Sequence, residues 1–260
     1  MKPTSTVSWP TRRSPGRPEL NHDARSAGRP VSAAQRGFSL IELLVVISII
    51  GVLAGIGAGM AGVASRKSKE ARVKGELNMY VTAIESYKAS FGQYPPDNSR
   101  AGTNYNPALN SLYYELAGTF TINQGKEYST TERQATILST VFQAVFGVQG
   151  FVNSVLPNVG TEKTQRPKNY LPTLKATQHP EVVLNKLNPT PVEILAVPVE
   201  WPRSTSFVAP LAAFTTDAKA LRINPWHYVS TQPTNNPATF DLWARVVIGK
   251  QERTYGNWKE

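Results

Sequence analysis

Residues 37–47 read Gly-Phe-Ser-Leu-Ile-Glu-Leu-Leu-Val-Val-Ile, and they open the apolar stretch on which the organisation of this chain depends. Residues 43–65 carry no charged side chain and are rich in Leu, Val and Ile. At ~1.5 Å per residue, a helix of this length crosses the ~30 Å hydrocarbon core of a bilayer. The sequence therefore predicts a transmembrane helix over 38–65. A soluble core helix is the weaker alternative, because uncharged runs of this length rarely stay in water.

One carboxylate, Glu42, interrupts the apolar stretch. It is the only ionisable side chain between Arg36 and Arg66. A lone charge inside a bilayer costs ~2.5–3.5 kcal/mol on insertion scales, so Glu42 requires a partner or a function. A secretory signal peptide is the other interpretation, but the run is too long for one and Gly62-Val63-Ala64 is a poor cleavage site.

Residues 37–47 closely resemble the cleavage and methylation signal of the type IV prepilin family, which includes the type II secretion pseudopilins. The resemblance implies that a prepilin peptidase removes residues 1–37 by cutting between Gly37 and Phe38, and that Phe38 is then N-methylated. It also implies that Glu42 meets the Phe38 amine of an adjoining subunit during assembly. The implied fold is α+β, with a long N-terminal transmembrane and spine helix packed on a C-terminal head that contains a small antiparallel sheet.

The net charge of +10 is spread along the chain. Residues 1–37 carry seven Lys and Arg against two acidic residues, 66–91 carry six against three, and 92–260 carry fifteen against twelve. A nucleic-acid surface would gather cations and aromatic residues on the C-terminal part, and no such run is present, so we expect no nucleic-acid partner. Because cations flank the apolar stretch on both sides, the positive-inside rule decides the orientation only weakly.

Composition excludes several other classes of protein. Residues 1–36 are rich in Pro, Ser and Arg without apolar periodicity, which predicts a disordered segment. The absence of cysteine excludes disulfides, thiolate metal sites and cysteine nucleophiles. The three histidines are far apart in the sequence and match no metal-binding spacing.

An amphipathic stripe continues the helix beyond the apolar stretch as a spine over 66–91. The positions recur at spacings of three and four residues until Gly92 and Pro95-Pro96 end the pattern. The chain's own sheet is the expected cover, and a coiled-coil dimer is the alternative. Gly51, Gly55 and Gly59 share one face, which favours either close helix packing or simple flexibility. The stripe consists of Val73, Leu77, Tyr80, Ile84, Tyr87 and Phe91.

Residues 92–260 are predicted to form one globular head of short helices and strands. The expected helices cover 107–116 and the stretch from the capping-box pattern Ser129-Thr130-Thr131-Glu132 to Phe146. The expected strands cover 181–187, 192–199, 226–231 and 239–247, the last two forming a hairpin with a further turn at Gly249.

The C-terminal part carries a second resemblance. Asn224-Pro225-Trp226-His227-Tyr228, Phe240-Asp241-Leu242-Trp243 and Gly256-Asn257-Trp258 are similar to the signature of the major pseudopilin, the G subunit of type II secretion. With Tyr94-Pro95-Pro96, the likeness reaches both ends of the chain and leaves 97–222 unmatched. That subgroup binds calcium through an acidic loop, whereas 249–255 offers one carboxylate, Glu252, beside two cations, Lys250 and Arg253. We therefore expect no metal and no cofactor.

The leading hypothesis is a structural, non-enzymatic subunit of a type II secretion pseudopilus. The expected partners are the same chain and other pseudopilins, the prepilin peptidase, an inner-membrane assembly platform and membrane lipid. The expected location is the bacterial inner membrane, crossed once, with the head in the periplasm. The alternatives are a type IV pilus or DNA-uptake pilin, and a membrane-anchored enzyme or binding protein in which His227 and Asp241 could be imagined as a site. No nucleophile motif or phosphate-binding loop supports the enzyme.

Overall fold

The computed structural model of this 260-residue chain describes residues 37–98, 106–155, 166–203 and 206–258, except for the side chains of 57–61. The predicted leader lies outside the described residues apart from Gly37. The chain divides into two compact units, Met1–Val52 and Leu53–Glu260, and each is described here by itself.

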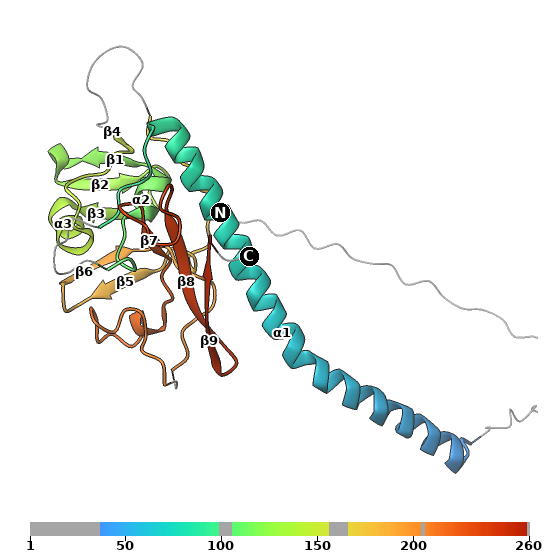
Figure 1. The fold of residues 1–260 in the computed structure, drawn as a ribbon. Coiled ribbons are helices and arrows are strands. Elements are labelled where there is room, and N and C mark those ends of the chain that lie inside the picture. Colours follow the sequence, from blue (N-terminus) through green and yellow to red (C-terminus); the bar gives the residue numbers. More distant parts are fainter. Residues whose placement is uncertain (1–36, 99–105, 156–165, 204–205, 259–260) are drawn as a thin grey trace, which may run out of the picture. The chain divides into compact units, whose positions relative to one another are not determined.

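One helix, α1, spans Leu40–Phe91 and belongs partly to each unit (Figure 1). Gly92 follows it with a φ of 74°, a left-handed conformation that glycine adopts at little cost. The Gly92 amide donates to the Lys88 carbonyl oxygen at 2.7 Å. The predicted end of the helix is therefore confirmed, whereas its start lies two residues later than Phe38.

Across the ranges that the structure describes, no helix is both long and apolar enough to cross a membrane. The assignment of 38–65 to a transmembrane helix stays a prediction.

The second half of α1 buries the predicted stripe against the C-terminal part of the same chain. Val73, Tyr80, Ile84 and Tyr87 are fully buried, and only Phe91 at the end is 37% exposed. The Tyr80 ring meets the Trp226 ring edge-on, with centroids 5.7 Å apart. The head of the same chain therefore covers the stripe, as expected from apolar positions that recur every three or four residues.

Three small sheets make up the strands of the head (Figure 1). The first has the order β3-β2-β1-β4, the second pairs β5 with β6, and the third has the order β7-β8-β9. Their strands are β1 Thr119–Ile122, β2 Glu127–Thr130, β3 Thr136–Leu138, β4 Ser154–Val155, β5 Glu181–Leu184, β6 Asn188–Glu193, β7 His227–Val229, β8 Asp241–Ile248 and β9 Gln251–Gly256. The short helices are α2 Leu112–Ala117, α3 Ser139–Phe146, η2 Asn123–Gly125 and η3 Ala220–Arg222.

The sheets extend the predicted α+β architecture in one respect. The sheet β7-β8-β9 is the small antiparallel sheet that was expected, with the turn at Gly249 in the left-handed region at φ 69°. The four-stranded sheet is mixed, because β1 pairs with β2 in antiparallel and with β4 in parallel fashion. The unmatched middle of the chain thus builds a sheet of its own.

The predicted starts of two helices are wrong. The helix expected over 107–116 begins only at Leu112, after a turn in which the Leu109 amide donates to the Asn106 carbonyl oxygen. The pattern Ser129-Thr130-Thr131-Glu132 is not a capping box, because Ser129 and Thr130 pair with β1 as the end of β2. The helix of that region is α3, and its inward positions Val141, Phe142, Val145 and Phe146 are buried as expected.

The strands of the C-terminal half match the prediction more closely. The hairpin of β7 and β8 is present where it was expected, with His227 opposite Trp243. The strand expected over 181–187 is shorter, and β6 ends at Glu193 instead of Val199. Beyond β6, only an isolated bridge joins Ala196 to Pro225.

Candidate processing and assembly site

Ser39 and Glu42 form a reciprocal capping box at the start of α1. The Ser39 amide donates to Glu42 Oε2 at 2.9 Å, and the Glu42 amide donates to Ser39 Oγ at 3.2 Å. In this motif two amides that the first turn of a helix leaves without intrahelical partners are satisfied by side-chain oxygens. The Glu42 carboxylate therefore has a hydrogen-bond donor within its own chain.

Gly37 and Phe38 lie before the first helical turn, outside any regular element. The Phe38 side chain is 82% exposed. A Cβ placed on Gly37 would meet no atom within 4 Å, so the fold itself does not require glycine at this position. Any requirement for glycine must come from a protein that binds this peptide bond.

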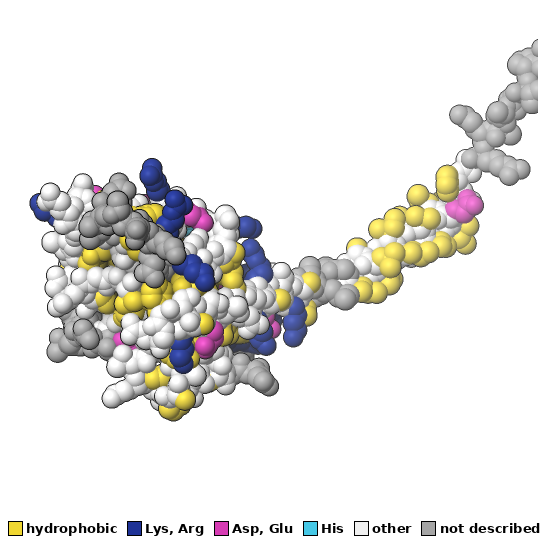
Figure 2. All heavy atoms as spheres, turned by 90° about the horizontal axis from the view of Figure 1, so that it is seen from above, with side chains coloured by type: hydrophobic (Ala, Val, Ile, Leu, Met, Phe, Trp, Pro, Cys, Tyr) yellow, Lys and Arg dark blue, Asp and Glu magenta, His cyan; other side chains and the backbone are white. Residues whose placement is uncertain are grey.

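Large apolar side chains are exposed along α1 from Leu40 to Ile56, and Figure 2 shows many of them on the face in view. Leu44, Ile47 and Ile50 are 53–58% exposed, and no face of this part is distinctly polar apart from its start. Apolar surface on this scale is costly in water and marks a region that a membrane or another protein covers. Glu42 is the one acidic residue in the first turn of this apolar segment.

The role of Ser39 is not among the expectations from the sequence, although a local signal for it is present. Ser39-Leu40-Ile41-Glu42 has the S-x-x-E spacing of a capping box directly before an apolar run. The same spacing at Ser129–Glu132 proved misleading, because the residues before it belong to a strand.

A buried carboxylate, Glu115, ties the second half of α1 to the head. Its Oε2 accepts hydrogen bonds from the Tyr87 hydroxyl at 2.9 Å and from the Asn153 amide at 3.1 Å, and its Oε1 accepts one from the Val152 amide at 2.9 Å. Burial raises the pKa of Glu115, and these donors oppose the shift. The contact joins α1, α2 and the segment before β4.

A second carboxylate, Glu76, lies where α1 meets the loop 175–179. The Gln178 amide nitrogen donates to Glu76 Oε1 at 2.8 Å, and the Gln178 Oε1 accepts from the Lys175 amide at 2.9 Å. Burial raises the pKa of Glu76 to about 7, opposed by Gln178, Arg72 and Trp226. Glu76 thus titrates near neutral pH where the second half of α1 contacts the head.

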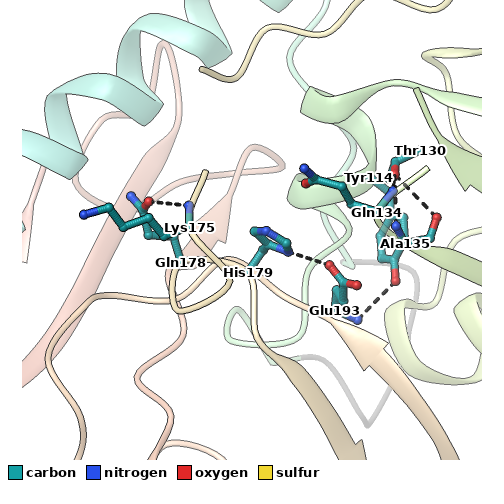
Figure 3. A network of polar contacts seen from close by, with 8 residues as sticks. All are labelled: Tyr114, Thr130, Gln134, Ala135, Lys175, Gln178, His179 and Glu193. Atoms are coloured by element: carbon teal, nitrogen blue, oxygen red, sulfur yellow. Dashed lines mark hydrogen bonds and ion pairs between the residues drawn. The ribbon is translucent and has the colours of Figure 1, made fainter. Parts of the chain in front are cut away.

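The same loop continues into a polar network beside a groove of about 1480 Å³ (Figure 3). His179 Nδ1 lies 2.7 Å from Glu193 Oε2, and the Glu193 amide donates to the Tyr114 hydroxyl at 3.1 Å. The His179 ring stacks on Tyr113 with centroids 5.0 Å apart. These contacts hold the loop against β6 and α2, and nothing in the sequence pointed to them because their partners are in separate elements.

His227 and Asp241 do not form a site together. His227 is buried in β7, stacks on Trp243 at 5.1 Å, and has a pKa lowered by burial to about 4. The Asp241 carboxylate accepts the Asn235 and Asn236 amides at 2.8 and 2.9 Å and so fixes the turn between β7 and β8. His227 is a buried strand histidine, and Asp241 is a turn-capping residue.

The residues of 249–255 do not fit a calcium ion. Calcium requires several oxygen ligands with net negative charge, and the one carboxylate of this segment, Glu252, is paired with Arg245. Arg253 is paired with Glu70 of α1. Among the described residues there is no group of three or more His, Cys, Asp or Glu side chains that could hold a metal.

Comparison with known proteins gives one family match, near the start of the chain, and several similar pilins and fimbrial proteins. Residues 32–58 match the family described as the prokaryotic N-terminal methylation motif. The type IV major alpha-pilin of Moraxella bovis is 47% identical over 53 residues, which are 20% of this chain and 33% of that pilin. Fimbrial protein EcpB of Eikenella corrodens is 42% identical over 96 residues, which are 32% of this chain and 60% of that protein.

Fimbrial protein EcpC of Eikenella corrodens is 34% identical over 88 residues, which are 33% of this chain and 58% of that protein. The chain therefore spans between a third and three fifths of the length of these curated relatives. No solved structure matches the chain. The chain carries the N-methylation motif of type IV prepilins at residues 32–58, and stretches of 53 to 96 of its residues are similar to type IV pilins and fimbrial proteins.

Proposed function

We propose that this chain is a structural subunit of a filament built by the type IV pilin route, and that the filament is a type II secretion pseudopilus. The observation that carries the proposal is the arrangement of three features at the start of α1. An exposed Gly37-Phe38 bond precedes a capped helix start, and the helix continues as an apolar segment whose large side chains are exposed among the described residues. A protruding apolar helix with a separate folded head suits a heterologous, non-closing interface and hence a helical filament.

In the proposed pathway each residue has one role. A prepilin peptidase cleaves between Gly37 and Phe38, and the new Phe38 α-amine is methylated. The apolar segment holds the subunit in the inner membrane, with the head in the periplasm, until an assembly platform adds it to the filament. Glu42 then exchanges its Ser39 amide for the Phe38 amine of the adjoining subunit, because a charged donor makes the stronger hydrogen bond in low dielectric.

Mass spectrometry of the chain purified from its own membranes tests the processing step. The expected N-terminus is methylated Phe38, and Gly37→Leu should leave the precursor uncut. Gly75→Leu is a matched control, because a Cβ at Gly75 likewise meets no atom within 4 Å. An N-terminus at Met1 or beyond Ala64 would contradict the proposal.

A type IV pilus subunit is the second candidate function. The observation that favours it is the naming of the similar proteins, which are pilins and fimbrial proteins. The C-terminal signature from Asn224 to Trp258 supports the pseudopilus instead. Deletion of the gene separates the two: loss of substrate secretion without loss of surface fibres supports the pseudopilus, and loss of surface fibres or DNA uptake supports the pilus.

We also propose that the head needs neither calcium nor another cofactor and performs no catalysis. The support is the pairing of Glu252 with Arg245 and the use of Asp241 as a turn cap. Thermal melts of the full chain with calcium and with a chelator should coincide. A melting temperature that rises with calcium concentration would reveal a site and contradict this proposal.

A further inference from the structure

A cluster of cations surrounds the point where the second half of α1 first meets the head. Arg66, Lys67 and Lys69 follow directly after the apolar residues 43–65 and are exposed. Lys250 joins them from the turn between β8 and β9, 181 residues after Lys69 in the sequence and likewise exposed. We call Arg66, Lys67, Lys69 and Lys250 the basic collar.

The fold, and not the helix alone, assembles the collar. A Cβ placed on Gly249 would lie 3.4 Å from Arg66 Cζ, so the guanidinium lies against the backbone of the β8–β9 turn. Arg253 of β9 pairs with Glu70 of α1, which fixes the hairpin beside the helix at this level. Lys250 directly follows Gly249 in this turn and so belongs to the same segment that meets Arg66. Figure 2 shows dark blue side chains gathered where α1 emerges from the head.

Ion pairs among the described residues neutralise only part of the positive charge of the collar. Two carboxylates of the elements that carry the collar, Glu70 and Glu252, are paired with Arg253 and Arg245. Lys67 reaches Glu70 only at 4.0 Å and keeps 78% of its side chain exposed. No ion pair among the described residues engages Arg66, Lys69 or Lys250.

The height of the collar matches a layer of lipid headgroups. The headgroup region extends about 5–8 Å beyond the hydrocarbon core on each side. At ~1.5 Å per residue, Arg66 to Lys69 occupy about 5 Å of helix immediately after the apolar run. Cations at this level interact with anionic headgroups, each favourably and within a screening length of ~8–10 Å.

We infer that the basic collar binds anionic phospholipid headgroups and so seats the head on the membrane before assembly. The inference rests on the proposed membrane insertion and adds the partner of the surface next to it. The positive-inside rule places cations on the cytoplasmic side, so cations kept just outside the apolar segment on the opposite side need such a partner. Lys250 is the decisive residue, because it is remote in sequence and serves no hydrogen bond or ion pair among those of the described residues.

The experiment measures lysine acylation by mass spectrometry on the full chain in nanodiscs. One set of discs contains phosphatidylcholine alone and the other contains phosphatidylglycerol as well. In the anionic discs, acylation of Lys67, Lys69 and Lys250 should slow by about fivefold at low salt and recover at high salt. Lys126 and Lys175, which are exposed on other elements, are internal controls and should not change.

A charge-reversal variant tests the part that only the fold supplies. Lys250→Glu should weaken the lipid-dependent protection of Lys67 and Lys69, whereas Lys126→Glu, the matched control, should leave it unchanged. Lys250 is exposed in a turn, so the variant is expected to fold, and an unchanged melting temperature checks this.

Each other outcome overturns the inference. Equal protection in both kinds of disc would show simple steric cover, and protection by inorganic phosphate in phosphatidylcholine discs would show a free-anion site. Protection that appears only after filaments form would assign the collar to an acidic partner subunit. If the chain does not enter the discs at all, membrane insertion fails and the collar inference with it; if it enters but shows no lipid-charge dependence, only the collar inference fails.

Discussion

The two halves of α1 present the same kind of element in opposite situations. From Leu40 to Ile56 the helix is apolar on all sides and its side chains are exposed, whereas from Val73 to Tyr87 one face is buried by the head. Within the part of the chain that the structure describes, the first half is left exposed, and the second is covered by the head. Under the proposed function, filament assembly depends on the first half and stability of the head on the second, and substitutions should separate them.

The largest effect is expected for Glu42→Val in the first half. The substitution removes the only charge of the apolar segment, so insertion and processing should stay intact or improve. Filament yield should fall by about tenfold or more, because the Phe38 amine of the next subunit would be buried without its partner. Glu42→Asp should lie between, since its carboxylate is one methylene shorter.

The assay measures sheared filaments or secretion together with the amount of processed, membrane-inserted subunit. Wild-type assembly by Glu42→Val would show that Glu42 is a tolerated membrane charge. Wild-type assembly would also contradict the proposal that the first half of α1 has its own role in assembly.

The next effect is expected for Leu77→Ala in the second half. Leu77 is 6% exposed against the core, so truncation should lower the free energy of unfolding of the head by about 3 kcal/mol. Leu44→Ala, the matched control, removes the same atoms from a side chain that is 53% exposed and should change it by less than about 0.5 kcal/mol. Urea unfolding in detergent measures both. Equal losses would mean that the head also covers the first half.

Two tyrosine–carboxylate hydrogen bonds sharpen the comparison within the second half. Tyr87→Phe removes a buried donor to Glu115 and should cost about 1 kcal/mol. Tyr94→Phe removes an exposed donor that lies 3.2 Å from Glu85 Oε1 and should cost less than about 0.5 kcal/mol. Urea midpoints of the two variants report the difference. A larger loss of stability for Tyr94→Phe than for Tyr87→Phe would contradict the role of Glu115 as the link between the second half of α1 and the head.

The smallest effect is the pH dependence of stability that arises from Glu76, at the contact between the second half of α1 and the head. Its pKa is raised from 4.5 to about 7 in the folded chain, so the folded state binds more protons than the unfolded state between these pH values. Stability should therefore fall as pH rises from 4.5 to 7. Glu76→Gln should remove this part of the slope and stabilise the head above pH 7 by roughly 1 kcal/mol, since the group is partly exposed and screened.

Unfolding measured from pH 4 to pH 8 checks this prediction. Toward pH 4 the difference between the two proteins should disappear, because Glu76 becomes protonated in both the folded and the unfolded state. A wild-type slope that Glu76→Gln leaves unchanged would place the titration on another group.

Local periodicity determined the parts of this protein that follow a single regular pattern. The uncharged run, the stripe from Val73 to Phe91 and the stop at Gly92 were readable because helix contacts repeat every three to four residues. The β7–β8 hairpin was readable for the same reason, since its strands are neighbours in the sequence. Even the capping of Glu42 by Ser39 was present as a local signal, although it was overlooked.

Tertiary structure decided what the local patterns left ambiguous. Ser129-Thr130-Thr131-Glu132 fits a helix start, but pairing with β1 makes Ser129 and Thr130 part of a strand, because tertiary pairing outweighs a weak local preference. The partners of Glu115 and Glu76 were equally hidden, since they are 28 to 102 residues away in sequence. Only the folded chain brings the turn at Gly249, and with it the adjoining Lys250, to the level of Arg66, because a contact between a helix and a distant hairpin leaves no period in the sequence from which it could be inferred.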